Sequence, residues 1–263
     1  MTRLYIITLH RSGSTWLRNI LHQNSRIEFA IDELNIYEPF RANTLDKYFK
    51  YGVNKNLLIT DITNKKVFGS FFKKSDVDSL KQIVRELDRS SSVWDFLRLY
   101  SEKFDVDYFG FKYPCHVRAF RKLESYDRSA KFIFLTRKLN DLHFSKINDK
   151  SPFMSQRGLI GVLFRLYVLF YNCLSYLLLI KSSHQHNPNV ITVSYENMIS
   201  NPEICIKRIE EHLGLSLSLN SLRIRGKHSS HENDNRTLSK DLWLIEKKMI
   251  TYTENYADSI VNC

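Results

Sequence analysis

The fold is decided by LYIITL at residues 4–9 and HRSGST at residues 10–15. Residues 4–9 form a mostly apolar run that includes β-branched residues, which is typical of a short buried strand. Gly13 and its neighbouring hydroxyl residues interrupt the apolar run. Apolar side chains then recur at helical spacing, at Trp16, Leu17, Ile20 and Leu21. The segment predicts a strand, a tight loop and a helix.

Three later segments have the length and composition of strands: DYFGFK at 107–112, KFIFLT at 131–136 and NVITVS at 189–194. Each precedes a helix-like stretch. Alternation of this kind predicts a three-layer α/β fold, with a mostly parallel central sheet and helices on both faces. Ligands of such sheets bind at the carboxyl ends of the strands. The polar segments 146–156 and 227–240 are predicted to be loops.

Length and composition predict one globular domain over residues 1–263, because no Pro/Gly/Ser-rich linker divides the chain. Hydrophobic residues make up 43% of it, enough to build a large core. The formal net charge of +11 favours anionic ligands. The basic residues are scattered rather than gathered into a tract, so we predict no nucleic-acid partner.

The four cysteines, Cys115, Cys173, Cys205 and Cys263, lie far apart, which indicates neither a zinc site nor a disulfide framework. No cluster of histidines and acids predicts a metal site. The first residues lack the pattern of a secretory signal, so we expect a cytoplasmic protein. The apolar segment 158–180 is predicted to be a buried or partner-facing helix, and a membrane-associated helix is the alternative.

The loop at residues 10–15 is suited to an anion, because backbone N–H groups are free at the start of a helix. Gly13 allows close approach, the hydroxyl residues donate hydrogen bonds and Arg11 adds a charge. The phosphate loop of nucleotide hydrolases requires a second glycine followed by lysine, and both are absent here. The alternative is an ordinary turn with Ser14 or Thr15 as the helix N-cap.

Residues 8–16, TLHRSGSTW, closely resemble the 5′-phosphosulfate loop of sulfotransferases. Cytosolic members carry T-Y-P-K-S-G-T-T-W there, and carbohydrate sulfotransferases carry R-S-G-S. The resemblance implies that the donor, 3′-phosphoadenosine 5′-phosphosulfate (PAPS), is bound by Ser12, Gly13, Ser14, Thr15 and Trp16. It places Arg11 beside the transferring sulfuryl group. His10 departs from the proline of the cytosolic pattern.

A second element, KFIFLTRKLNDLHFS at 131–145, consists of a strand, Arg137 and, eight residues later, Ser145. On its own this pattern also describes a solvated arginine and a helix serine. In sulfotransferases a strand-Arg-x₇-Ser unit holds the 3′-phosphate of PAPS, so the resemblance implies that role for Arg137 and Ser145. Lys138 to Asp141 replace the Asp-Pro often found in carbohydrate-type members.

Two further stretches resemble the family less closely. Residues 190–215 are similar to its strand, Y-E-D-L, D-P-E and F-L-G-L sequence, where we expect Tyr195 to be a core residue and Glu196 to be an acid at a helix start. Residues 226–236, GKHSSHENDNR, are similar to the late cofactor loop of bacterial and carbohydrate members. That similarity implies PAPS contacts from Ser229, Asn235 and Arg236.

Sulfuryl transfer needs cations at the leaving group and a general base for the acceptor proton. Glu38 in YEPF at 37–40 is our candidate base, since carbohydrate sulfotransferases carry a similar motif there. Glu33 is its rival, and an exposed loop carboxylate is the structural alternative. Lys112 matches the lysine of the cytosolic K-T-H motif. His116 stands two positions later than that motif's histidine, so it is a reserve base.

The resemblance implies a PAPS-dependent sulfotransferase with a P-loop-like fold. It would transfer a sulfuryl group to a hydroxyl, or an amine, of a carbohydrate or a small hydroxylated metabolite, and release 3′-phosphoadenosine 5′-phosphate (PAP). One alternative is a P-loop-type kinase or nucleotide hydrolase. The other is a non-catalytic basic binding protein with a decayed cofactor loop.

Overall fold

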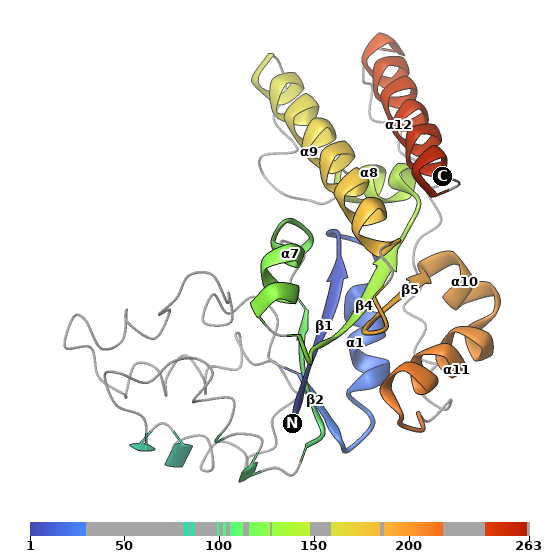
Figure 1. The fold of residues 1–263 in the computed structure, drawn as a ribbon. Coiled ribbons are helices and arrows are strands. Elements are labelled where there is room, and N and C mark those ends of the chain that lie inside the picture. Colours follow the sequence, from blue (N-terminus) through green and yellow to red (C-terminus); the bar gives the residue numbers. More distant parts are fainter. Residues whose placement is uncertain are drawn as a thin grey trace.

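The structure is a computed structural model, and it describes residues 1–29, 82–83, 85–86, 99, 102–103, 106–112, 116–126, 128–147, 159–184, 187–217 and 240–261. The predicted α/β fold is confirmed. A sheet of parallel strands lies at the centre of these residues, with helices packed against it (Figure 1).

The sheet has the strand order β2-β3-β1-β4-β5, and all four strand pairs are parallel. The strands are β1 (Thr2–Thr8), β2 (Ile27–Phe29), β3 (Tyr108–Lys112), β4 (Lys131–Thr136) and β5 (Val190–Ser194). Four of them were predicted from their apolar runs. The edge strand β2 was not, because three residues are too few to show an alternating pattern.

The longer helices are α1 (Ser14–Leu21), α7 (His116–Tyr126), α8 (Leu139–Ile147), α9 (Leu159–Ser183), α10 (Tyr195–Ser200), α11 (Pro202–Leu213) and α12 (Lys240–Val261). Helix α11 begins with a proline at its first position and ends at Gly214, which adopts the left-handed conformation that glycine favours. The predicted helix at 158–180 corresponds to α9. The predicted polar loops at 146–156 and 227–240 lie outside the described residues, except that residues 146 and 147 belong to α8 and residue 240 begins α12.

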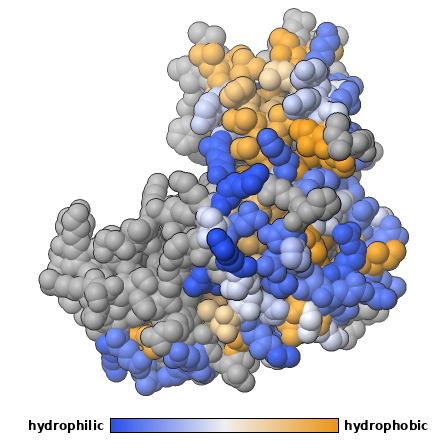
Figure 2. All heavy atoms as spheres, in the orientation of Figure 1, coloured by the Kyte–Doolittle hydropathy of each residue, from blue (hydrophilic) through white to orange (hydrophobic). Residues whose placement is uncertain are grey.

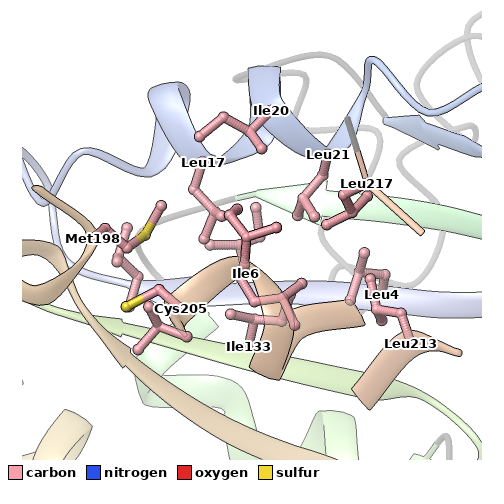
Figure 3. Close-up of a cluster of buried hydrophobic side chains, with 14 of the residues drawn as sticks. Leu4, Ile6, Leu17, Ile20, Leu21, Ile133, Met198, Cys205, Leu213 and Leu217 are labelled. Atoms are coloured by element: carbon pink, nitrogen blue, oxygen red, sulfur yellow. The ribbon is translucent and has the colours of Figure 1, made fainter. Parts of the chain in front are cut away.

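Alternate residues of β1 build two different cores, because successive side chains of a strand point to opposite faces. On one face, Leu4 and Ile6 pack under α1, α10 and α11, in the cluster of buried side chains shown in Figure 3. On the other face the core is aromatic. The Tyr5 ring stacks on Phe111 and Phe132 with centroids 5.1 and 5.3 Å apart, beneath α7.

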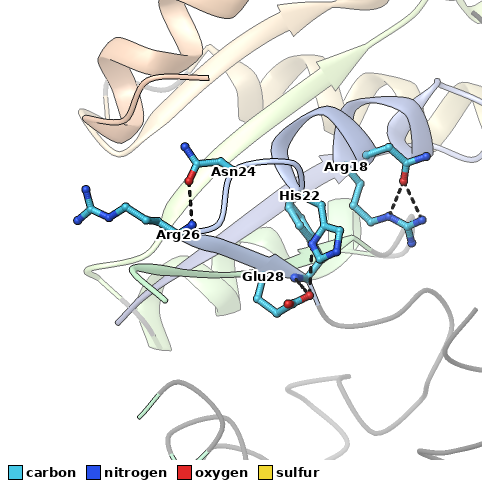
Figure 4. A network of polar contacts seen from close by, with 7 residues as sticks. Arg18, His22, Asn24, Arg26 and Glu28 are labelled. Atoms are coloured by element: carbon cyan, nitrogen blue, oxygen red, sulfur yellow. Dashed lines mark hydrogen bonds and ion pairs between the residues drawn. The ribbon is translucent and has the colours of Figure 1, made fainter. Parts of the chain in front are cut away.

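Polar contacts fix the turn that joins α1 to β2 (Figure 4). The Asn24 side chain accepts a hydrogen bond from the backbone N–H of Arg26 at 2.8 Å. The Glu28 carboxylate lies 3.3 Å from Nδ1 of His22 and accepts the N–H of Phe29. Phe29 then packs so tightly on β3 that a Cβ at Gly110 would lie 2.3 Å from its ring. These contacts hold β2 at the edge of the sheet.

Helices α9 and α12 lie side by side and rise above the sheet in Figure 1. Residues 161–183 of α9 are long and apolar enough to cross a membrane by length and composition alone. However, Arg165 is buried in a two-bond ion pair with Glu246 of α12, with Nη2 2.6 Å from Oε2. Asn172 is also buried, against His143 of α8. The polar residues that interrupt the apolar segment therefore serve helix packing.

Candidate active site

The carboxyl ends of four strands lie level with one another, and this register determines which loops come together at that edge of the sheet. Thr8 pairs with Leu135 across β1 and β4, and Thr136 pairs with Ser194 across β4 and β5. On the other side of β1, Lys112 pairs with Ile6. The segments that leave these strands consequently start beside each other. They include the loop at residues 10–15, Arg137 and the start of α10.

The loop after β1 has the backbone of an anion-binding turn. Arg11 and Gly13 adopt positive φ values of 68° and 87°, whereas Ser12 between them does not. Alternation of this kind turns successive N–H groups toward one concave side. Gly13 is the N-cap of α1 and no side chain caps the helix, so the alternative of an ordinary turn capped by Ser14 or Thr15 is not seen. The first N–H groups of α1 stay available for a ligand.

Ser12 holds the base of the loop. Its side chain is fully buried, and its hydroxyl is hydrogen bonded to the hydroxyl of Thr8. Thr8 in turn donates to the carbonyl of Leu135 at 3.0 Å. This chain of hydroxyls joins the start of the loop to β4, the strand that ends at Arg137. Ser14 is buried, and Thr15 is exposed at the helix start.

Arg137 reaches across from β4 and binds the same loop. Its Nη1 donates to the carbonyl of Arg11 at 2.7 Å. Its guanidinium also lies 4.6 Å from the centroid of the Tyr195 ring, within the range of a cation–π contact. The Nε of Arg137 is buried without a hydrogen-bond partner among the described residues. The two predicted phosphate-binding elements are therefore in direct contact.

Tyr195 forms a wall beside the loop. A Cβ added at Gly13 would lie 2.4 Å from Cε2 of Tyr195, so only glycine fits there. The Tyr195 ring also meets Trp16 edge-on, with centroids 6.0 Å apart. Burial raises the pKa of the Tyr195 phenol, although the nearby charge of Arg137 opposes the change. The phenol therefore stays protonated near neutral pH.

Glu196 holds the chain after Arg137 in place. One oxygen of its carboxylate accepts the backbone N–H of Lys138 at 2.9 Å, and the other accepts the hydroxyl of Ser194 at 2.8 Å. Ser194 also caps α10 by accepting the N–H of Asn197. The expected roles of Tyr195 as a core residue and Glu196 as a helix-start acid agree with these contacts. The contact of Tyr195 with the loop was missed, although its place directly after a strand was the available signal.

Lys112 approaches from the end of β3, on the other side of the loop. Its Nζ donates to the Thr15 hydroxyl at 3.1 Å. With Arg11 and Arg137, it places three cationic side chains around the helix start, where the dipole of α1 already favours an anion. Within the described residues no group of three or more histidines, cysteines or acids could hold a metal ion.

The remaining predicted residues are placed only in part. Ser145 lies half-buried in the second turn of α8, and His116 is the first residue of α7. Glu33, Glu38, Ser229, Asn235 and Arg236 lie outside the residues that the structure describes. The same is true of Tyr113, Pro114 and Cys115 beside His116.

A family model described as "Sulfotransferase family" matches residues 3–218, which include all but the first residue of the five described strands and both predicted phosphate-binding elements. The chain belongs to the sulfotransferase family. It is therefore a PAPS-dependent enzyme that transfers sulfuryl groups. Family membership argues against the alternative of a kinase or nucleotide hydrolase. Comparison of the sequence with curated proteins gave no match.

Solved structures of other sulfotransferases share the fold. The sulfotransferase domain of the Synechococcus PCC 7002 olefin synthase has a TM-score of 0.56 at 15% identity, with 96% of this chain and 94% of that domain covered. A sulfotransferase from Alicyclobacillus acidocaldarius has a TM-score of 0.53 at 11% identity, with 100% and 96% covered. The predicted P-loop-like sulfotransferase fold is thereby confirmed.

Proposed function

We propose that this sulfotransferase moves the sulfuryl group of PAPS onto a hydroxyl, or an amine, of a carbohydrate or a small hydroxylated metabolite. The observation that carries the proposal is the bond from Arg137 to the carbonyl of Arg11. It joins the loop after β1, which resembles the 5′-phosphosulfate loop, to the element that resembles the 3′-phosphate site. A nucleotide with phosphates at both its 5′ and 3′ positions matches a site with two such elements.

Two features of the described residues fit this donor. The cradle at Gly13 admits no Cβ, so backbone N–H groups can approach a phosphate closely. The buried Nε of Arg137 offers a donor with no protein acceptor among the described residues. When bound, PAPS supplies the sulfuryl group and leaves as PAP. Arg11, Lys112 and the loop N–H groups would stabilise the negative charge that develops on the leaving oxygen.

The remaining cofactor contacts belong to the same proposal. Ser145 would accompany Arg137 at the 3′-phosphate, and Ser229, Asn235 and Arg236 would add contacts from the late loop. Thermal shift assays with PAP, ADP and ATP, with and without Mg²⁺, test the donor class. We expect stabilisation by PAP without metal, and a smaller effect in an Arg137→Ala variant. Stabilisation by ATP that depends on Mg²⁺ would favour a kinase instead.

We propose Glu38 as the general base. The chain leaves β2 at Phe29, at the carboxyl ends of the strands, where the loop at residues 10–15 also lies. In the sheet, β2 is two strands away from β1. Two strand spacings are about 10 Å, and nine extended residues reach up to roughly 30 Å, so the nine residues from Phe29 to Glu38 can reach the site. Glu33 and His116 are the rival bases.

Glu38→Gln should keep PAP affinity and lower turnover at least about a hundredfold, the scale of general-base catalysis. The amide has nearly the shape of the carboxylate but cannot accept the acceptor proton. Single-turnover sulfuryl transfer and calorimetric PAP titration measure the two effects separately. Glu33→Gln and His116→Gln are the matched controls. Near-normal turnover in Glu38→Gln, with loss in one control, would move the role to that residue.

The acceptor class can be found by incubating labelled PAPS with glycans, phenols, steroids and alkaloid-type metabolites. Mass spectrometry would detect the added sulfuryl group on the product. A sugar product supports the carbohydrate reading, which the R-S-G-S and Y-E-P-F elements favour. The cytoplasmic location is likewise a proposal, and cell fractionation would test it.

A further inference from the structure

Helix α9 presents an unbroken apolar stripe to solvent. Between residues 161 and 180 every exposed side chain is apolar or a tyrosine: Leu163, Tyr167, Phe170, Leu174 and Leu178. Their intervals of four, three, four and four residues place them along one side of the helix. Arg165, the charged residue in this part of α9, is buried and paired. We call these five residues the α9 stripe.

Helix α12 carries a second stripe with the same spacing, formed by Ile245, Met249, Tyr252 and Tyr256. These residues are exposed, and Tyr252 is the most exposed of them at 74%. Intervals of four, three and four residues again place them along one side of the helix. We call these four residues the α12 stripe.

The two stripes face the same direction. On α9, Asn172 contacts His143 of α8, and Arg165, on the same side of the helix, pairs with Glu246 of α12, which also lies 3.6 Å from His143. On α12, Glu254 also points toward α8, since it accepts the N–H of Asn140. At 3.6 residues per turn, the α9 stripe lies on the opposite side of its helix from Arg165 and Asn172, and the α12 stripe lies on the opposite side of its helix from Glu254. Together the stripes form one face of the helix pair, and Figure 2 shows apolar side chains gathered over α9 and α12.

This α9–α12 face is large enough for a stable association. An aromatic side chain has roughly 200 Å² of surface, so the four exposed rings alone present on the order of 500 Å². With the five aliphatic side chains, the face approaches the roughly 800 Å² that each partner contributes to a standard interface. It exceeds the apolar patches of about 300–600 Å² that are usual on monomers.

We propose that the α9–α12 face binds the same face of a second copy of the chain. A two-fold axis would pack two helices on two helices, as in a four-helix bundle. The spacing of four and three residues is the spacing by which helices interlock. The stripes are free of charged side chains, so the face is complementary to itself without any charge pairing.

A lipid bilayer fits this face less well. Surface-lying helices carry an excess of lysine and arginine beside their apolar side. Here, among the described side chains of the two helices, three exposed lysines, Lys181, Lys247 and Lys248, stand against one exposed acid, Asp258, and the lysines are spread over two helices rather than forming a row beside the stripes. Tyr167, Tyr252 and Tyr256 also place phenol hydroxyls within the face rather than at its edge.

Sedimentation velocity of the full chain, over a wide range of protein concentration, tests the proposal. The wild type should be a dimer, and Phe170→Glu should weaken dimerisation at least about a hundredfold, because two carboxylates would be buried against apolar surface. Ile204→Glu on α11 is the matched control, since Ile204 and Phe170 are each 63% exposed. Far-UV circular dichroism and melting temperature establish that each variant folds. If Phe170→Glu fails to fold, Tyr252→Glu takes its place.

A monomeric wild type would overturn the proposal, and so would a folded Phe170→Glu variant that remains dimeric. Flotation with phosphatidylcholine and phosphatidylserine vesicles tests the rival occupant. Vesicle binding by a monomer, abolished by Phe170→Glu but kept by Ile204→Glu, would replace the second copy with a membrane. None of these measurements requires sulfuryl transfer, so the outcome is independent of the proposed acceptor and base.

Discussion

At the scale of single residues, the site depends on a glycine that two constraints impose together. Gly13 has a positive φ of 87°, and the Tyr195 ring occupies the space of a side chain. Either constraint alone disfavours other residues. Tyr195 cannot easily give way, because it packs between Trp16 and the guanidinium of Arg137.

Gly13→Ala should therefore weaken PAP binding at least about tenfold, since displacement of Tyr195 or of the loop costs more than about 1.4 kcal/mol on the scale of backbone strain. Titration calorimetry measures this change. Gly214→Ala is the control, because Gly214 also has a positive φ, of 65°, but a Cβ there meets no atom within 4 Å. It should lower stability by about 1 kcal/mol and leave PAP affinity unchanged. Equal affinity losses in both variants would show that strain, not the Tyr195 contact, matters.

The residues of the site differ in how far the sequence predicts them. Arg11 and Arg137 stand in recognisable motifs, and the structure places both in one contact. The link between Tyr195 and Gly13 was not predictable, because it depends on strand register and on the conformation of the loop. The same holds for the hydroxyl chain from Ser12 through Thr8 to β4, since no local pattern marks a contact between segments more than a hundred residues apart.

At the scale of elements, periodicity predicted α9 well, because a long apolar run has few alternatives. Periodicity did not predict which residue would pair with Arg165, a charged residue within that helix. Arg165 is paired with Glu246, 81 residues away, and His143 of α8 joins the pair at 3.6 Å. Burial disfavours the Glu246 carboxylate, but its bonds to His143 and Arg165 outweigh burial and lower its pKa. The carboxylate is therefore charged at neutral pH.

Glu246→Gln should destabilise the protein by about 3–5 kcal/mol, because it leaves the Arg165 charge buried without compensation. Urea denaturation measures the loss. The double variant Arg165→Met, Glu246→Leu should recover most of the stability, since no charge then remains buried. Failure of the double variant to recover it would mean that the pair specifies the arrangement of α8, α9 and α12 rather than only neutralising charge.

At the scale of the whole molecule, stability should depend on pH through His212 of α11. Burial, and then the charge of Lys131, lower the pKa of His212 to about 4 from its usual 6.5. The folded state thus favours neutral His212, while the unfolded chain binds a proton below about pH 6.5. This contribution to stability is complete above that pH and is lost as the pH falls toward 4.

The His212→Gln variant should show a flatter decline of melting temperature between pH 6.5 and pH 4, because it removes the titrating group. Differential scanning calorimetry across this range checks the prediction. His184→Gln, at an exposed histidine, serves as the control. If wild type and His212→Gln lose stability in parallel, His212 does not govern the acid response.

The bond between Arg137 and the carbonyl of Arg11 ties the end of β4 to the loop after β1 within the protein itself. A phosphate group that binds Arg137 would compete with the carbonyl oxygen of Arg11 for its N–H groups. A substitution of Arg137 would then release the loop at residues 10–15 even before a nucleotide binds. Hydrogen exchange at residues 10–15 would register that release in the absence of ligand, and would separate the structural role of Arg137 in holding the loop from its proposed role in phosphate binding.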